Sequence, residues 1–316
     1  MINYFRTYFP LKTTFIRGET GVLNELKWSD RFNIGVDSID KAHQRLFSIV
    51  DKLLNLNEDM EKQQHACREG IKYFKNYTFK HFTEEEAYMV SIQYPQYEMH
   101  KRLHDNMRDK TIPALERELE EQQYSMESIQ HFLGICIGWL NGHIMIEDRA
   151  ITGRSSNKWI HQPADDEMNS LEKAIIQVVQ DLFRVNAQAI STHYGGEDFS
   201  FGNALCYRLN YKAQDGKRLQ VFLVYENQMI LRTLEAILGK QLKKLDKTVV
   251  YAMKVLSQKF VDCVATHFIL TDGYELERND MLTFEQFTRT FDKEYPPYNL
   301  LFDMGGKGYF AFCIKK

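Results

Sequence analysis

Histidines and carboxylates recur along residues 81–148 at spacings suited to metal binding. His81 and Glu85 are four residues apart, and so are His100 and His104. An α-helix advances about 100° per residue, so each pair would project from one helix face, one turn apart. These spacings predict pairs of ligands for a metal ion.

The full candidate set combines imidazoles with carboxylates: His43, His81, Glu85, His100, His104, His143 and Asp148. A single His-x-x-x-His pair occurs often by chance, but several histidines on inward helix faces would be costly to bury without partners. A metal removes that cost. Nitrogen and oxygen ligands in this number exceed the tetrahedral demand of one zinc ion and suit two bridged ions such as iron or manganese.

Four helices are expected to position these residues, joined by short connections into an up-down-up-down bundle. Apolar spacing predicts that the first helix continues to Leu54 and that the second ends near Met89. It predicts that the third begins at Tyr97 and bends around Pro113, and that the fourth continues to Ile144. Asp37 or Ser38 is the expected cap of the first helix, and Ser125 or Ser128 that of the fourth. Asp148 lies about 140° from His143 on an ideal helix, so it would reach the same centre only where that helix frays or bends.

Four longer patterns contain all of these residues. They are Gly-Val-x-x-Ile-Asp-x-x-His from Gly35, His-Phe-x-x-Glu-Glu-x-x-Met from His81, Tyr-Pro-x-x-x-x-His-x-x-x-His from Tyr94 and Trp-Leu-x-x-His-Ile-x-x-x-Asp from Trp139. With these patterns, the stretch from Trp28 to about Arg149 resembles a bacterial hemerythrin domain.

The resemblance implies a non-heme site with two iron ions bridged through oxygen. It implies that one iron is held by His100, His104 and His143, that the other is held by His43 and His81, and that Glu85 and Asp148 bridge them. The implied ligand is dioxygen, with nitric oxide as an alternative, bound at the iron that has two histidines. The candidates for an apolar ligand pocket are Phe47, Phe82, Leu103, Met107, Leu140 and Ile144, each of which could equally be plain bundle core.

Other polar residues near the candidate ligands are assigned to the surface. Glu84 and Glu86 flank the bridging carboxylate but point off its face, so we expect them to be solvated. His131 lies about 120° from His143 round the helix and is not an expected ligand. Met107 stands where the family commonly has Phe, and its flexible side chain fills the pocket less rigidly than a ring.

Length, charge and cysteine content limit the function classes. The 316 residues suggest two domains. Lys and Arg number 40 against 43 Asp and Glu, which argues against nucleic acid as a partner. The five cysteines form no C-x-x-C pair, and no apolar leader or uninterrupted run of about 18 apolar residues is present, so we expect a cytoplasmic protein with no membrane span.

The expected organisation is multidomain, with an all-α bundle followed by an α+β domain. Residues 1–27 form an N-terminal arm of unknown role, 28–150 the bundle, 151–164 a linker and 165–316 the second domain. In that domain the pattern predicts a β-hairpin over 204–225, helices over 229–238 and 248–266, and a strand pair over 300–314.

The second domain resembles, more weakly, the CheC/CheX-type chemotaxis phosphatases, which use a Glu-x-x-Asn pair on the longer helix. Leu256 and Lys259 stand at those positions here. An aliphatic side chain cannot orient water, so the resemblance implies a binding or dimerising role, with a response regulator or a second copy as partner. Gln258 and Asp262 are expected on a solvated helix face.

Together these features predict a dioxygen sensor or carrier with a C-terminal signalling domain, rather than a metabolic enzyme, and no catalytic residue is assigned. Two alternatives stay open. The same ligands permit a di-iron oxidase, a peroxidase or a nitric oxide-handling enzyme, and the second domain permits a phosphatase that the bundle regulates.

Overall fold

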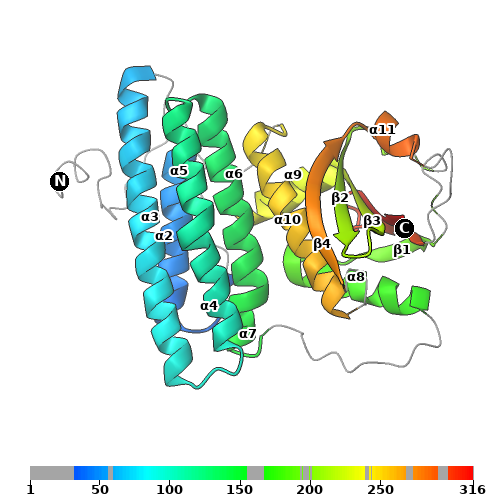
Figure 1. Cartoon of the computed structure of the whole chain (residues 1–316), viewed down its shortest axis with the longest axis horizontal. Coiled ribbons are helices and arrows are strands. Elements are labelled where there is room, and N and C mark those ends of the chain that lie inside the picture. Colours follow the sequence, from blue (N-terminus) through cyan, green and yellow to red (C-terminus); the bar gives the residue numbers. More distant parts are fainter. Residues whose placement is uncertain are drawn as a thin grey trace, which may run out of the picture.

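The computed structural model describes residues 32–55, 60–154, 167–192, 194, 199, 201–238, 242, 244–267, 273–290 and 298–315. The predicted arm at 1–27 and the predicted linker beyond Arg154 lie outside these ranges. Figure 1 shows a bundle of long helices beside a domain built on a β-sheet. The predicted fold class is confirmed.

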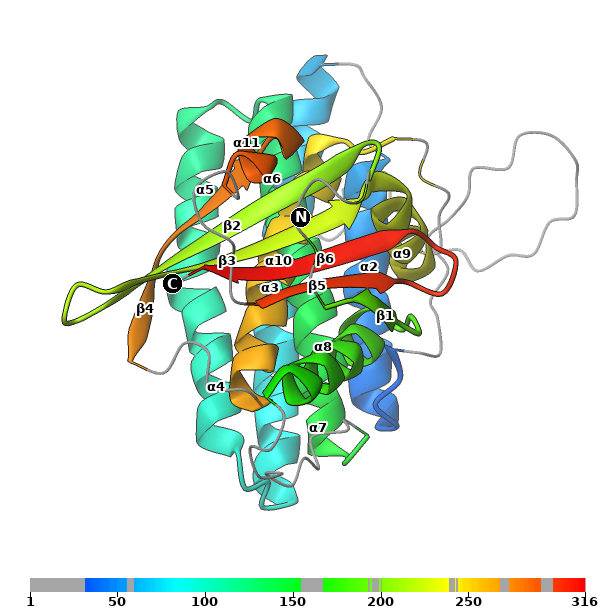
Figure 2. The same cartoon turned by 90° about the vertical axis from the view of Figure 1, so that its right-hand side faces the viewer.

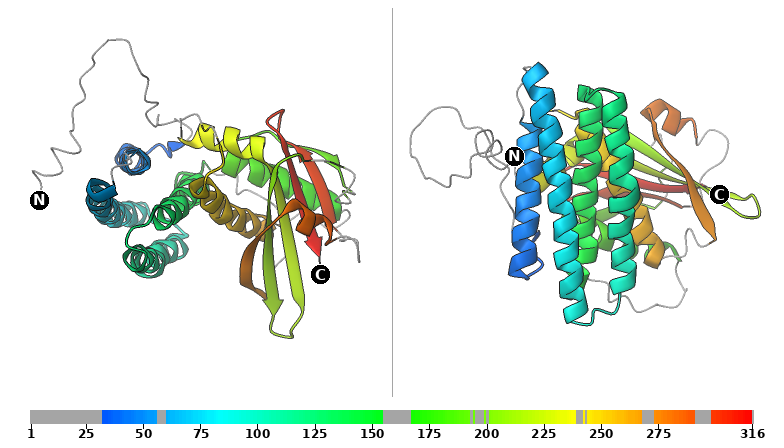
Figure 3. Two further views of the ribbon diagram at one scale, coloured as in Figure 1. Left: turned by 90° about the horizontal axis from the view of Figure 1, so that it is seen from above. Right: turned by 60° about the vertical axis from the view of Figure 1, so that its left-hand side comes forward.

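Four long rods form the bundle (Figure 3, left). Two are the helices α2, Asp37–Leu54, and α3, Met60–Ser91. The other two are composite: α4, Tyr97–Asn106, with η2, Met107–Thr111, and α5, Ile112–Glu121; then α6, Met126–His143, with η3, Ile144–Asp148, and α7, Arg149–Ile151. Ser125 caps α6 as predicted, because its side chain accepts the N–H of Ser128.

The start of α2 differs from the prediction. Its N-cap residue is Val36, which has no capping side chain, so neither Asp37 nor Ser38 has that role. Asp40, inside the first turn, instead accepts the backbone N–H of Ile34 at 2.7 Å. A buried carboxylate reaching back from the helix therefore orders the chain before it.

Two of the rods contain a π-helical turn, in which a backbone N–H bonds five residues back instead of four. Ile112 N–H donates to the carbonyl of Met107 in η2, and Arg149 N–H donates to that of Ile144 in η3. The first turn ends next to Pro113, where the bend was predicted. The second begins directly after His143.

The C-terminal domain is a six-stranded antiparallel sheet in the order β1-β5-β6-β3-β2-β4. The strands are β1, Gln188–Ser191; β2, Ala204–Ala213; β3, Arg218–Glu226; β4, Tyr274–Leu282; β5, Tyr298–Asp303; and β6, Tyr309–Lys315. The helices are α8, Glu167–Phe183; α9, Asn227–Leu238; α10, Lys247–His267; and α11, Phe284–Thr288. The predicted hairpin, helices and terminal strand pair are present, whereas β1, β4 and α11 were not predicted.

The two domains share one core. Helices α9 and α10 lie between the sheet and the bundle, as Figures 1 and 3 show; Figure 2 looks onto the sheet, with the bundle behind it. A single cluster of buried apolar side chains runs from Leu140 of α6 through Leu256 of α10 to Leu223 of β3. Burial of this cluster joins the domains through a hydrophobic contact.

Glycines on α6 allow α10 to approach closely. Gly134, Gly138 and Gly142 are spaced one turn apart. A Cβ atom on Gly134 would lie 2.6 Å from the carbonyl oxygen of Thr248, and one on Gly138 would lie 2.6 Å from that of Ala252. No side chain fits at either distance, so the helices pack backbone against backbone.

Among the described residues, one continuous helical run, Met126–Ile151, is long and apolar enough to cross a membrane by length and composition. Its apolar window is 72% buried inside the protein. The run corresponds to the fourth rod, which packs against both the bundle and α10, and burial on two sides accounts for its composition.

Candidate metal centre

The seven predicted ligands meet in the interior of the bundle. Each is buried, with an exposed fraction between 0% and 4%. All four rods contribute: His43 from α2, His81 and Glu85 from α3, His100 and His104 from α4, His143 from α6 and Asp148 from η3. His43 and Asp148, which are 105 positions apart in the sequence, thus lie in one cluster.

Glu85 lies at the centre of one group of histidines. Its Oε2 atom is 3.6 Å from Nε2 of His81, 3.8 Å from Nε2 of His100 and 3.4 Å from Nε2 of His104. The spacing of four residues places His81 and Glu85 on one face of α3, as predicted.

Asp148 contacts the remaining histidines. Its Oδ2 atom is 3.2 Å from Nε2 of His43, and its Oδ1 atom is 3.3 Å from Nε2 of His100 and 3.0 Å from Nε2 of His143. The π-helical turn makes this possible, because a five-residue step in η3 returns to the face of His143. The bend predicted near Asp148 is therefore a wider helical turn inside a continuous rod.

Two sets of ligand atoms lie close enough to hold an ion. One comprises Glu85, His100, His104 and His143, and the other His43, His81 and Glu85; the atoms of each set lie within 4.8 Å of one another. Glu85 belongs to both sets, and Asp148 contacts histidines of both. The arrangement can hold two neighbouring ions with carboxylates between them.

Buried ligand atoms that lack a hydrogen-bond partner show whether these residues suit a metal. Both carboxylate oxygens of Glu85 and of Asp148, and Nε2 of His43 and of His100, are buried without a hydrogen-bond partner. One such atom costs about 1–3 kcal/mol, and a charged one more. Cations would satisfy all of them together, and imidazole with carboxylate suits iron. The residues therefore fit a pair of iron ions.

Electrostatics divides the histidines into two kinds. Burial lowers the pKa of His81 to about 4 and that of His143 to about 3, so both imidazoles are neutral, which is the form that binds metal. Burial opposes the charge on His100 as well, but the carboxylates of Asp148 and Glu85 beside it raise its pKa to about 10. For Asp148, burial raises the pKa but the surrounding histidines outweigh it, so the pKa is held well below 3.8.

Glu86 is not solvated, contrary to the prediction. The Nδ1 atom of His104 lies 3.0 Å from its Oε1 atom, and the Glu86 side chain is only 16% exposed. Glu86 faces α4 because it lies about 100° round α3 from Glu85. Such a carboxylate fixes the orientation of a metal-binding imidazole. Glu84 is 55% exposed, as predicted.

Aromatic rings support two of the imidazoles. Phe82 stacks on His104 with ring centroids 4.0 Å apart, and Trp139 stacks on His143 at 4.2 Å. Trp139 was quoted in the sequence pattern but not chosen as a site residue, although it lies four residues before His143 and thus on the same helix face. These stacks leave the two rings little freedom to rotate.

The residues predicted for the ligand pocket divide into two groups. Phe47, Phe82, Met107, Leu140 and Ile144 are buried in the main apolar cluster. Leu103 is only half-buried and lines a cavity on the outside of the bundle. It precedes His104 by one position and so points about 100° away from it.

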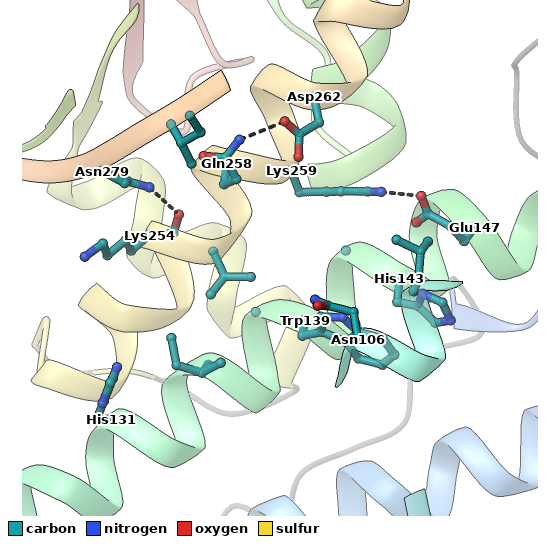
Figure 4. Close-up of a pocket in the computed structure, with 16 residues that line it drawn as sticks. Asn106, His131, Trp139, His143, Glu147, Lys254, Gln258, Lys259, Asp262 and Asn279 are labelled. Carbon is teal, nitrogen blue, oxygen red and sulfur yellow. Dashed lines mark hydrogen bonds and ion pairs between the residues drawn. The ribbon is translucent and has the colours of Figure 1, made fainter. Parts of the chain in front are cut away.

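This cavity, of about 420 Å³, lies between the bundle and the C-terminal domain (Figure 4). Trp139 and His143 line it from α6, and Gln258 and Asp262 line it from α10. Gln258 donates to the carboxylate of Asp262 at 2.7 Å and to the hydroxyl of Tyr211 at 3.2 Å. Asp262 is exposed, as expected, and Gln258 is half-buried, so this face of α10 forms one wall of an open cavity.

Histidines outside the centre have other roles where the structure describes them. His131 Nδ1 lies 2.8 Å from the carboxylate of Glu118, and its ring packs beside Tyr251. This position lies outside the two sets of ligand atoms.

Comparison with known proteins identifies relatives of the bundle. The family model of the hemerythrin HHE cation binding domain matches residues 34–154. Bacteriohemerythrin of Clostridium acetobutylicum is 34% identical over 124 residues, which are 39% of this chain and 95% of that protein. Myohemerythrin of Theromyzon tessulatum is 23% identical over 128 residues, 40% of this chain and 92% of that protein.

Solved structures similar to this chain include chemotaxis proteins. CheX of Vibrio vulnificus matches with a TM-score of 0.34 and 8% identity, over 49% of this chain and 99% of that one. The CheX-CheY-BeF3-Mg complex of Borrelia burgdorferi matches with a TM-score of 0.36 and 10% identity, over 48% of this chain and 99% of that one. These are the proteins that residues 165–316 were expected to resemble.

Proposed function

Because the chain belongs to the hemerythrin family, we propose that its bundle binds two iron ions and, with them, dioxygen. The proposed ligands of one iron are His100, His104 and His143, those of the other are His43 and His81, and the proposed bridges are Glu85 and Asp148. When bound, such a pair of irons supplies the electrons and the open coordination position with which dioxygen is held reversibly.

One observation carries this proposal. The orphaned carboxylate oxygens of Glu85 and Asp148 lie between two sets of histidines, deep inside the bundle. Two carboxylates at 0% exposure need positive charge beside them, which a pair of bound metal ions would supply. Both carboxylates contact histidines of both sets, which supports a bridging role.

The surrounding side chains orient the ligands and exclude water. Glu86 accepts the Nδ1 proton of His104, which leaves the Nε2 lone pair of that ring free for a metal. Phe82, Leu140 and Ile144 are buried around the same helices and supply no protons. An apolar wall of this kind favours reversible binding of dioxygen over its reduction.

We propose that the C-terminal domain responds to the state of this centre. The shared core and the close packing of α6 on α10 support a sensor over a simple carrier. Phosphatase activity is disfavoured because Leu256 is fully buried and Lys259 is held in an ion pair with Glu147. Neither side chain can position a water molecule for hydrolysis.

A reducing cytoplasmic location is part of the proposal. All five cysteines are free thiols and buried. Burial raises the pKa of Cys67 to about 12, and also raises that of the others, which keeps them protonated and unreactive.

Iron content and the optical spectrum test the proposed function. We expect about two irons per chain and, after the reduced protein meets air, a charge-transfer band that disappears when oxygen is removed. Immediate oxidation without such a band would favour redox or nitric oxide chemistry. A chain that takes up no iron would refute the site.

A further inference from the structure

A lysine of the C-terminal domain reaches the segment that carries Asp148. Lys259 of α10 forms an ion pair with Glu147, the residue immediately before Asp148 in η3 (Figure 4). The two side chains are 22% and 18% exposed. The pair therefore lies largely inside the contact between the domains.

The pair holds a turn of unusual geometry. Asp148 reaches the histidines because residues 144–148 are π-helical, and a π turn is less favourable than the α-helix on either side of it. Glu147 lies on the outer face of this turn and is drawn towards α10, while Asp148 faces the bundle. An external contact at Glu147 thus resists rewinding of the turn, which would move Asp148 away from the centre.

The surroundings of Lys259 fix its position. Its stem packs beside Gly142, where an added Cβ atom would lie 3.2 Å from Cγ of Lys259. The positive charge of Lys259 neutralises Glu147, whose carboxylate is partly desolvated and whose second oxygen has no hydrogen-bond partner. Loss of one member of such a pair leaves an uncompensated charge in the contact.

We propose that Lys259 is a positioning residue for the metal centre: by pairing with Glu147 it holds the π-helical turn that presents Asp148, so the C-terminal domain sets how tightly the bundle retains its metal. This inference rests on the proposed metal site. Coupling between two sites is reciprocal, so metal binding in turn strengthens the contact of η3 with α10. Metal binding in the bundle is thus coupled to the C-terminal domain through the contact of η3 with α10.

A second ion pair between the same helices provides a matched control. Lys247 of α10 pairs with Glu127 in the first turn of α6, and both side chains are more than half exposed. Sixteen residues of helix, roughly 24 Å, separate Glu127 from His143. Removal of this pair weakens the contact between the domains without touching the metal turn.

The experiment compares full-length Lys259→Met, Lys259→Arg, Glu147→Gln and Lys247→Met with the wild type. Each protein is loaded with cobalt(II) or iron(II) without air, and three quantities are measured: bound metal, the rate of metal loss to an excess of chelator, and the visible spectrum of the cobalt form. The spectrum reports ligand geometry, which a purely structural contact would leave unchanged.

We expect Lys259→Met to lose metal roughly tenfold faster than the wild type and to alter the cobalt spectrum. Lys259→Arg should restore both properties, and Lys247→Met should stay within about twofold of the wild type. The double variant Lys259→Met with Glu147→Gln should lose metal no faster than Lys259→Met alone, because the two substitutions remove the same ion pair.

Equal rates and spectra for Lys259→Met and Lys247→Met would overturn the inference while leaving the metal site intact. Absence of metal from the wild type would refute the proposed function itself, and the inference with it. If Lys259→Met fails to fold, Glu147→Gln decides, because it keeps the shape of the side chain and removes its charge. If Glu147→Gln retains metal as tightly as the wild type and has the same cobalt spectrum, the inference is also overturned.

Discussion

At the scale of single residues, the centre of the bundle holds charged groups that the metal-free protein can balance only with protons. His100 keeps a proton between Glu85 and Asp148, whereas His81 and His143 stay neutral. Protons and metal ions therefore compete for the same atoms, and the two predictions at this scale follow from this competition.

Removing one ligand should empty the centre. We expect His81→Ala and His104→Ala to lower both the iron content and the melting temperature, because metal binding and packing of the bundle are coupled. The control is His131→Ala, since that side chain pairs with Glu118 outside the centre. Iron content by elemental analysis and calorimetric melting are the measurements, and unchanged iron in both ligand variants would contradict the assignment.

The metal-free protein should be most stable near pH 6.5. The pKa values of His81 and His143 are lower in the folded state than their ordinary value of 6.5, so the unfolded chain binds more protons below pH 6.5 and stability falls towards about pH 4. The pKa of His100 is raised, so stability also falls as pH rises from 6.5 to about 10.

Denaturation midpoints across this range, with and without metal, measure the effect. Metal displaces the proton of His100, so the loss of stability above pH 6.5 should become smaller in the loaded protein. Despite burial, the pKa of His104 is also raised, by Glu85 and Glu86, so a loss of stability above pH 6.5 that is equally large with and without metal would show that neither His100 nor His104 is the group responsible.

At the scale of elements, two local features shape the site: the π turn of η3 and the glycine face of α6. Each departs from an ordinary helix, and each departure allows a contact with a residue or helix outside the feature itself. The first moves Asp148 over His143, and the second lets α10 lie directly on the backbone of α6. The fourth rod thus serves both domains.

Gly138→Ala should separate α6 from α10. The new Cβ atom would lie 2.6 Å from a backbone oxygen that cannot move alone, and overpacking of this kind costs about 1–3 kcal/mol. The better helix propensity of alanine returns at most about 1 kcal/mol.

Gly142→Ala is the comparison, because its nearest neighbour is the flexible stem of Lys259 at 3.2 Å. We expect a smaller loss of unfolding free energy there, measured by denaturant titration. Equal losses would mean that the closeness of the helix backbones does not limit this contact.

At the scale of the whole molecule, the shared apolar cluster predicts a single cooperative unfolding transition. All three tryptophans lie within the first 159 residues, and Trp139, which lies in α6, gives a fluorescence signal from the bundle. We expect it to change at the same denaturant concentration as amide exchange in β3 and β6, and metal should shift both together. Two separate transitions would show that the domains unfold independently and would weaken the case for a sensor.

The amino-acid sequence by itself determined the bundle, the candidate ligands that meet inside it and the larger elements of the sheet domain. His81 with Glu85, and His100 with His104, are recognisable because helical periodicity is local and needs no knowledge of neighbouring helices. Strand β4 was not recognised, because it is a polar strand at the edge of the sheet and lacks the alternation of a half-buried strand.

Tertiary structure alone decided which side chains support the ligands. Glu86 meets His104 from another helix, and Lys259 meets Glu147 from another domain. Even the approach of Asp148 depends on a π turn that packing sustains and no local preference predicts. Such contacts join residues far apart in the sequence, and their partners are set by how helices pack against one another, which the spacing within one helix does not encode.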